Sequence, residues 1–191
     1  MKILILQNRM GIGDMIMFLP FIEAISKKFK TPVTILAKKN TNVEMYFNNK
    51  EIVEEIMYLE RENNKKHSGV KGFFKLVNEL KLKKFDKVFI FNSSLRYFLI
   101  SKFSGIKEVF HYPLFKKKNQ QIIEAAKEFT LKSIGEDIES TPRLFLKEQD
   151  ILKAKKDHSI DQSITNVILG IGGSGKTKRV PASIFKSFMS K

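Results

Sequence analysis

Short apolar runs alternate with amphipathic stretches along this chain, and that alternation constrains the fold more than any other feature. Five apolar runs predict strands, namely 2–6, 32–37, 52–59, 87–91 and 108–112. Four stretches with apolar residues at helical spacing predict helices, namely 14–29, 70–82, 94–103 and 119–134. Apolar strands separated by helices are typical of a parallel sheet that is covered by helices on both faces. The sequence therefore predicts an α/β, doubly wound, Rossmann-like domain.

The texture of the sequence changes after Gly135, and a new strand–helix unit is predicted near the end. An apolar run at 166–170 predicts a strand, a glycine-rich loop follows it, and a helix is expected from Pro181. We expect three segments: an N-terminal Rossmann-like domain over 1–150, a helix and linker over 151–164, and the opening βα unit of a second Rossmann-like domain over 165–191. A complete second domain needs roughly 100 more residues, so the chain is expected to be truncated.

The chain is strongly basic, with 35 Lys and Arg against 20 Asp and Glu and a formal net charge of +15. Only five of the basic residues are Arg, and the Lys residues are spread along the whole chain. A surface that reads phosphates favours Arg for its bidentate fork, so no nucleic-acid partner is expected. The chain has no Cys, and its three His, at 67, 111 and 158, share no ligand spacing. We therefore expect no disulfide and no metal site.

The N-terminal apolar run "MKILILQN" predicts a strand and not a signal peptide, because no small-residue cleavage site follows it. No run of 18 apolar residues occurs anywhere in the chain. The expected location is therefore the cytoplasm. Lys-rich faces also allow peripheral attraction to the anionic inner face of the inner membrane.

The first predicted strand is followed by a glycine turn, "RMGIGDM", that opens a helix. Gly11 and Gly13 allow a tight turn and the close approach of a ligand, and Asp14 falls in the first helical turn. An acidic residue at this place has a structural explanation, since it complements the helix dipole. A catalytic role is the alternative. The dinucleotide pattern G-x-G-x-x-G is not present at this turn.

The C-terminal loop "GIGGSGKT" (Gly170–Thr177) matches the phosphate-loop pattern of nucleoside triphosphatases. That interpretation requires a helix to begin at Lys176, but Pro181 would disrupt such a helix. It also requires a downstream acidic strand to hold Mg²⁺. We therefore favour a phosphate-binding loop of another kind, and keep the triphosphatase as an alternative.

Three segments together resemble glycosyltransferase family 9, the bacterial ADP-heptose:lipopolysaccharide heptosyltransferases. They are "NRMGIGDMIMFLPFIEAI", "FDKVFIFNSSLRYFLISKFSGIKEVFHY" and "IGGSGKTKRVP", and they occur in the family's order. The corresponding family patterns are R-x-S-S-x-G-D-x-x-x-x-x-P, Y-D-x-x-x-D-x-Q-G-x-x-[KR]-S and P-G-A-S-x-x-x-K-R-W-P. The chain departs from these patterns at Ile90, at Asn92–Ser93 and at Val180, where the family often has Asp, Gln-Gly and Trp. Arg9 is also shifted or unmatched relative to the family's leading basic residue.

The resemblance implies the GT-B fold, in which two Rossmann-like domains face each other across a cleft. It implies that Asp14 is the catalytic base, and that a carboxylate there deprotonates the acceptor hydroxyl. The implied acceptor-binding residues are Gly11, Gly13, Asn92, Ser93 and Arg96. The implied residues for the donor phosphates are Gly173, Ser174 and Lys178, with Lys178 offsetting charge on the departing diphosphate.

The implied reaction is transfer of a sugar, heptose in this family, from a nucleotide-diphosphate sugar to a lipopolysaccharide-type, lipid-linked saccharide acceptor. The donor, expected to be ADP-linked, is a substrate, so no cofactor and no metal are expected. Because the second domain is expected to be incomplete, the fragment by itself is expected to be inactive. A non-catalytic nucleotide- or sugar-binding remnant is the remaining alternative.

Overall fold

The computed structural model describes the chain apart from residues 10, 48–49, 115–119, 145, 171–178 and 190–191. It divides into two compact units, Met1–Phe145 and Leu146–Lys191, and each is described by itself. The predicted segment boundaries at 150 and 164 stay predictions.

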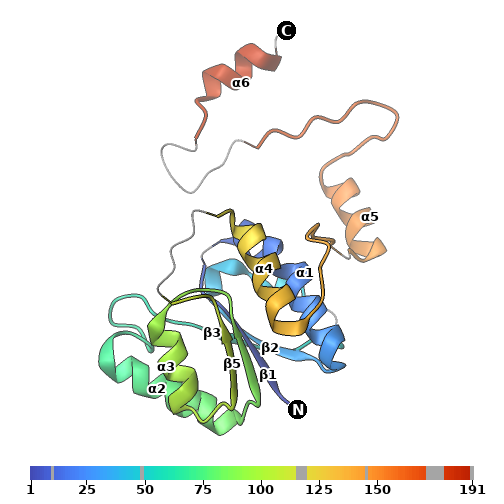
Figure 1. Cartoon of the computed structure of the whole chain (residues 1–191). Coiled ribbons are helices and arrows are strands. Elements are labelled where there is room, and N and C mark those ends of the chain that lie inside the picture. The colour runs from blue at the N-terminus through green and yellow to red at the C-terminus, as the bar shows by residue number, and fades with distance from the viewer. Residues whose placement is uncertain (10, 48–49, 115–119, 145, 171–178, 190–191) are drawn as a thin grey trace. The chain divides into compact units, whose positions relative to one another are not determined.

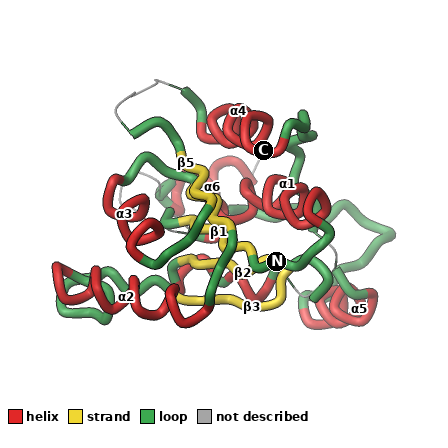
Figure 2. Tube along the Cα trace, turned by 60° about the horizontal axis from the view of Figure 1, so that its bottom comes forward, coloured by secondary structure: helices red, strands yellow, loops and turns green. Residues whose placement is uncertain are grey.

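The first unit is built on a five-stranded parallel sheet in the order β3-β2-β1-β4-β5 (Figures 1 and 2). The strands are β1 (Ile3–Gln7), β2 (Val33–Ala37), β3 (Val53–Tyr58), β4 (Lys87–Ile90) and β5 (Glu108–His111). All five predicted strands are confirmed within two residues. Every residue of β1 and β2 is buried, because both strands lie inside the sheet and are covered on both faces.

Helices cover both faces of the sheet. They are α1 (Ile12–Phe29), α2 (Gly69–Lys83), α3 (Leu95–Phe103) and α4 (Ile122–Ile134), and two short 3₁₀ turns, Lys39–Thr41 and Val43–Met45, follow β2. Side chains alternate along a strand, so Ile3 and Ile5 pack with α1 and α4, whereas Leu4 and Leu6 pack with α2 and α3. The two helix pairs lie on opposite sides of the strands in Figure 1. The predicted α/β, Rossmann-like fold is confirmed.

Aromatic rings fix α1 and α4 to the end of β4. The ring of Phe91, the residue after β4, lies 5.1 Å from the ring of Phe18 on α1 and 5.1 Å from the ring of Phe129 on α4. Both pairs are edge-to-face, a geometry that stabilises by about 1 kcal/mol beyond area burial. These contacts hold the two helices against the edge of the sheet where the strands end.

The second unit contains two helices, α5 (Glu148–Asp157) and α6 (Ala182–Met189). The helix predicted from Pro181 is confirmed, and the amide of Ile184 donates to the carbonyl of Pro181 at 3.0 Å. The strand predicted at 166–170 is wrong, because these residues form no regular secondary structure and Ile168 is 90% exposed. A strand requires a neighbouring strand for its backbone hydrogen bonds, and no other strand lies among the described residues of this unit.

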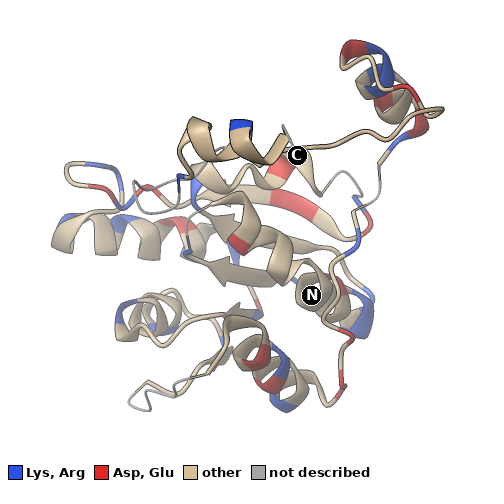
Figure 3. Ribbon diagram, turned by 90° about the horizontal axis from the view of Figure 1, so that it is seen from above, with Lys and Arg blue, Asp and Glu red and all other residues tan. Residues whose placement is uncertain are grey.

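Charged residues occur on many helices and loops, and both signs are found on most of them (Figure 3). Pairs such as Lys28–Glu136 and Lys83–Glu55 join elements that are distant in sequence. Across the part of the chain that the structure describes, no helix is long and apolar enough to cross a membrane.

Candidate functional site at the carboxyl edge of the sheet

The carboxyl ends of the parallel strands share one edge, and the direction of the strand order changes between β1 and β4. The chain leaves β1 through α1 toward β2, but leaves β4 through α3 toward β5 on the other side. Ligands of open α/β sheets bind at such a switch point, outside the carboxyl ends of the strands. The predicted site residues of the first unit all follow β1 or β4, so the fold brings their loops to this edge.

The turn after β1 has a backbone reason for its first glycine. Gly11 precedes α1 with φ of 104° and ψ of 158°, a backbone conformation that residues other than glycine rarely adopt. A Cβ atom at Gly13 would meet no atom within 4 Å, so nothing in the described protein requires glycine there.

Asp14 lies in the first turn of α1 and is partly exposed. Among the described residues, none makes a hydrogen bond or an ion pair with its carboxylate. Its charge complements the helix dipole, but it caps no amide. The carboxylate is therefore available to accept a proton from a ligand at the switch point.

The turn after β4 is built by Asn92. Its Oδ1 accepts the amide hydrogen of Ser94, the residue that precedes α3, at 2.9 Å, while its Nδ2 is buried and has no hydrogen-bond partner in the described part of the chain. Ser93 is exposed and lines the pocket described below. Asn92 thus shapes the loop that presents Ser93.

Arg96, in the first turn of α3, is engaged with the loop that precedes α2. Its Nη2 donates to the carbonyl of Gly69 at 2.8 Å and to the carbonyl of His67 at 3.1 Å. The guanidinium carbon lies 5.4 Å from the centre of the Phe73 ring. Burial, and then the nearby charge of Arg61, lower the pKa of Arg96. The acceptor contact predicted for Arg96 stays a prediction, and the structure gives this residue a structural role as well.

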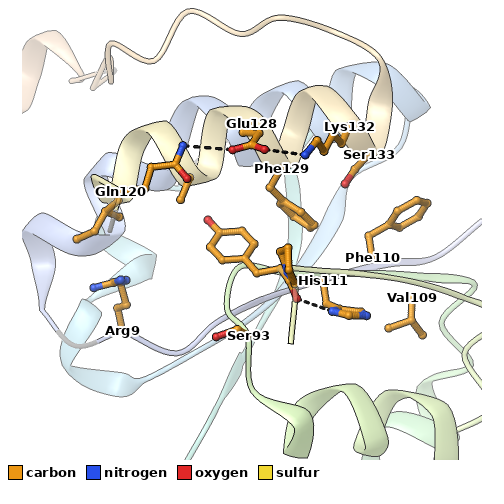
Figure 4. Close-up of a pocket in the computed structure, with 14 residues that line it drawn as sticks. Arg9, Ser93, Val109, Phe110, His111, Gln120, Glu128, Phe129, Lys132 and Ser133 are labelled. Atoms are coloured by element: carbon orange, nitrogen blue, oxygen red, sulfur yellow. Dashed lines mark hydrogen bonds and ion pairs between the residues drawn. The ribbon is translucent and has the colours of Figure 1, made fainter. Parts of the chain in front are cut away.

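A pocket of about 860 Å³ opens between β5, the face of α4 and the residues that follow β1 and β4 (Figure 4). Val109, Phe110 and Phe129 supply apolar wall, and Arg9, Ser93 and Gln120 supply polar groups. This size and mixture suit a small ligand with both apolar and polar surface.

The charges of the pocket are unevenly paired. Glu128 accepts hydrogen bonds from Lys132 Nζ at 2.6 Å and from Gln120 Nε2 at 3.3 Å (Figure 4). The guanidinium of Arg9 makes no hydrogen bond or ion pair with any residue that the structure describes. Arg9 is therefore the cation of the pocket that is available to an anionic or hydroxyl-bearing ligand.

Three polar atoms near the ends of the strands are buried and have no hydrogen-bond partner among the described residues. They are Gln7 Nε2 at the end of β1, Asn92 Nδ2 after β4 and the hydroxyl of Tyr112 after β5. Burial raises the pKa of Tyr112, against an opposing effect of Arg9, so the hydroxyl is neutral and keeps its hydrogen. Each unsatisfied group costs about 1–3 kcal/mol. Native structures retain few unsatisfied buried groups, so a ligand that completes their hydrogen bonds would explain these three.

Sequence reasoning missed Arg9, Gln7 and Tyr112 as members of this edge. For Gln7 a signal existed, because a polar residue ends the otherwise apolar strand "ILILQ". Arg9 lies outside the family pattern. Tyr112 continues an apolar run, and only the tertiary structure shows that its hydroxyl has no partner.

Other predicted groups lie outside what can be described. The donor-side residues Gly173, Ser174 and Lys178 fall within 171–178, as does most of the Gly170–Thr177 loop, so both interpretations of that loop lie outside the described residues. In the described part of the chain, no group of three or more His, Asp or Glu could hold a metal ion.

The fold matches solved structures of glycosyltransferases. A family 9 glycosyl transferase from Veillonella parvula DSM 2008 superimposes with a TM-score of 0.68 at 16% identity, over 97% of this chain and 58% of that chain. The E. coli ADP-heptose lps heptosyltransferase II gives 0.56 at 17% identity, over 85% and 52%. The E. coli heptosyltransferase WaaC with ADP gives 0.57 at 13% identity, over 100% and 64%.

These similarities confirm, at the level of fold, the predicted resemblance to glycosyltransferase family 9 and the GT-B fold class. The chain spans between about half and two thirds of the length of these solved structures. No family model and no curated protein matches the sequence.

Proposed function

We propose that the protein, in its full-length form, is a glycosyltransferase that moves a sugar from a nucleotide-diphosphate sugar to a saccharide acceptor. The observation that carries the proposal is Asp14. In a chain with a glycosyltransferase fold, this carboxylate lies at the switch point of the sheet, without a hydrogen-bond or ion-pair partner among the described residues. A carboxylate in this setting has the chemistry that glycosyl transfer needs.

In the proposed reaction, an acceptor hydroxyl attacks the anomeric carbon of the donor sugar as Asp14 removes its proton. The bond between the anomeric carbon and the diphosphate oxygen breaks, and the nucleoside diphosphate leaves with that electron pair. Lys178, with Gly173 and Ser174, is proposed to hold the donor phosphates, since a cation there offsets the charge that grows on the leaving group.

The pocket beside α4 is proposed to receive part of the acceptor. Arg9, Ser93 and Gln120 offer hydrogen-bond donors, and Tyr112 and Phe129 form an aromatic wall against which a sugar ring can pack. The names of two similar structures mention heptosyltransferases, one with ADP-heptose and one with ADP. They support a finer proposal, which is an ADP-linked heptose donor and a lipid-linked, lipopolysaccharide-type acceptor. A cytoplasmic location, with Lys-rich faces attracted to the inner membrane, fits such an acceptor.

The test is Asp14→Asn in the full-length protein, assayed by release of nucleoside diphosphate and by mass of the glycosylated acceptor. Loss of the base should lower kcat by about 10²-fold or more, with an unchanged melting temperature. Glu124→Gln is the matched control, because Glu124 is also acidic in the first turn of a helix, α4, and is not among the pocket residues. Equal, small effects of the two variants would reduce Asp14 to a helix-dipole residue.

Binding measurements on the full-length protein distinguish the proposed transferase from the alternative, a nucleoside triphosphatase. We expect Lys178→Ala to weaken nucleoside-diphosphate binding much more than Lys176→Ala does, as measured by calorimetry. Tight, Mg²⁺-dependent ATP binding that Lys176→Ala abolishes would restore the triphosphatase.

A further inference from the structure

The loop between β3 and α2 is closed by a single buried histidine. The side chain of His67 is 1% exposed. Its amide donates to the carbonyl of Glu60 at 2.7 Å, and its Nδ1 lies 3.1 Å from the amide nitrogen of Glu60. Two hydrogen bonds therefore join residues 60 and 67, and they close the six exposed residues 61–66 into a loop.

The partners of the ring determine where its hydrogen lies. The amide of Glu60 can only donate, so Nδ1 must accept and the ring hydrogen must be on Nε2. Nε2 then donates to Glu79 Oε2 on α2 at 3.1 Å, while Glu79 Oε1 accepts from Lys66 Nζ at 2.8 Å. Burial works against the charge of Glu79, but the hydrogen bonds from Lys66 and His67 outweigh it and lower its pKa. The neutral ring with hydrogen on Nε2 thus satisfies every partner.

The backbone of His67 is held from two further directions. A Cβ atom at Gly72 on α2 would lie 2.2 Å from the carbonyl carbon of His67, so the two backbones are in close contact. Arg96 on α3 donates to the carbonyl of His67. Elements α2 and α3 therefore fix this residue, while the loop that it closes stays exposed.

The closed loop carries basic residues at the functional edge. Arg61, Lys65 and Lys66 lie in it, and it follows the carboxyl end of β3. The guanidinium carbon of Arg61 lies 5.7 Å from the centre of the Tyr97 ring in the first turn of α3. Lys66 forms an ion pair with Glu79. Arg61 and Lys65 lie in the same loop, so their positions depend on the hydrogen bonds of His67 that close it.

We propose that His67 is a positioning residue: its neutral ring clasps loop 61–66 so that Arg61 is held at the carboxyl edge, and protonation of the ring releases the loop. A hydrogen added to Nδ1 would face the Glu60 amide, so two donors would oppose each other and the clasp would open. The charged groups around the ring are Glu79 from α2, Glu60 and Lys66 from the loop, and Arg96 from α3.

Limited digestion with trypsin tests the clasp directly, because Arg61, Lys65 and Lys66 are cleavage sites within the loop. On the 191-residue chain, His67→Gln should raise cleavage after Arg61 by about tenfold relative to cleavage after the exposed Arg143, since local opening controls access. His158→Gln, at an exposed histidine, is the matched control and should change nothing.

The pH dependence provides the second readout. In the unmodified chain, cleavage after Arg61 relative to Arg143, compared between about pH 8 and about pH 5.5, should be higher at the lower pH, because a hydrogen on Nδ1 would oppose the Glu60 amide. It should be high and flat in His67→Gln. If that variant fails to fold, the unmodified chain still decides. Equal relative cleavage at every pH would overturn the clasp.

The functional part of this inference rests on the proposed transferase activity. In the full-length protein, His67→Gln should raise the KM for an anionic saccharide acceptor by about tenfold, with a smaller change in kcat, because it displaces binding groups and not the base. The proposal also predicts that the acceptor affinity of the unmodified protein falls at low pH, and that His67→Gln removes this dependence. If no transfer is detected at all, the proposed transferase activity fails, and the digestion still decides whether His67 closes the loop.

Discussion

The apolar residues of the two units differ in burial. In Met1–Phe145, apolar residues of the sheet and four helices form two buried clusters, one on each face. In Leu146–Lys191, no described residue is buried, and large apolar side chains such as Ile168, Phe188 and Met189 are exposed. Both regions carry the same strand-and-helix pattern in sequence.

This difference shows that an apolar run forms a strand only where neighbouring strands can pair with its backbone. In β1, Ile5 pairs with Ile35 and Phe89 on its two sides, so the backbone hydrogen bonds and the side chain are both satisfied. Residues 166–170 have a similar composition but no neighbour of this kind among the described residues of their unit. Tertiary partners, and not local propensity, decide the outcome.

Hydrogen exchange should show the largest contrast between the two units. Amides of β1 and β4 should be protected by about 10⁴-fold or more, because they exchange only through global opening. Amides of α5 and α6 should be protected by less than about 10²-fold, since short exposed helices are marginal alone. Mass spectrometry of peptides from each element measures this. Comparable protection in α6 and β1 would show that the second unit has a core of its own.

Truncation of an isoleucine in each unit should give the next largest contrast. Ile5→Ala should lower the free energy of unfolding by about 4 kcal/mol, because Ile5 is fully buried in the central strand. Ile168→Ala should change it by less than about 0.5 kcal/mol, because that side chain is 90% exposed. Urea titrations followed by circular dichroism provide the values. A large loss from Ile168→Ala would contradict the comparison.

Alanine at a glycine of each unit tests packing on a finer scale. Gly72→Ala should destabilise by about 3 kcal/mol, because the added Cβ would overlap the backbone of His67. Gly170→Ala should have an effect below about 0.5 kcal/mol, since no atom of the described residues lies within 4 Å of the added carbon. Thermal melts of the two variants distinguish these outcomes, and a stable Gly72→Ala would show that α2 can shift.

The smallest expected contrast concerns two carboxyl groups whose pKa values are both lowered. The pKa of Glu79 is lowered because hydrogen bonds from Lys66 and His67 outweigh burial, and the pKa of Asp161 is lowered chiefly by hydrogen bonds from Ser163. A lowered pKa contributes stability above the ordinary value of the group, and this stability is lost as pH falls through the folded-state pKa.

Glu79→Gln should therefore lower the unfolding free energy by about 0.5–1 kcal/mol at pH 7, and the difference should shrink toward zero at acidic pH. Asp161→Asn should leave global unfolding unchanged at both pH values, because Asp161 stabilises only a local turn. Urea titrations at pH 7 and pH 3.5 measure both. A pH-independent effect of Glu79→Gln would point to packing and not to charge.

The fold of the first unit could be predicted from sequence because the spacing of its apolar residues matches the side chains that the structure buries. The apolar run at 2–6 corresponds to the buried strand β1, and the predicted helix 14–29 corresponds to α1, in which Met15, Phe18, Ile22 and Ile25 are buried and Phe29 is half-buried. The predicted strand at 166–170 failed because strand pairing is a property of several segments and cannot be read from one.

The parts of the candidate site that depend on local backbone geometry could be predicted from sequence. The parts that depend on contacts between distant segments could not. Gly11 has the positive φ that a glycine turn suggests, and Asp14 lies in the helix turn that the pattern predicts. The acceptor contact implied for Arg96 stays a prediction, and the structure adds that its Nη2 donates to carbonyls 27 and 29 residues away in sequence. No local pattern contains that information, nor the unpaired hydroxyl of Tyr112.

The face on which α4 packs limits how far the sheet can grow. Helix α3 lies on the face opposite α1 and connects β4 to β5 in a step away from β1. A right-handed connection that continued in that direction would need its helix on the face of α3. Helix α4 packs with α1 instead, so a further parallel strand reached through it would require a left-handed crossover, which about 2% of such connections show. The chirality of L-amino acids thus favours β5 as the last strand on this side, and among the described residues no strand pairs with its outer edge, beside the pocket that α4 walls.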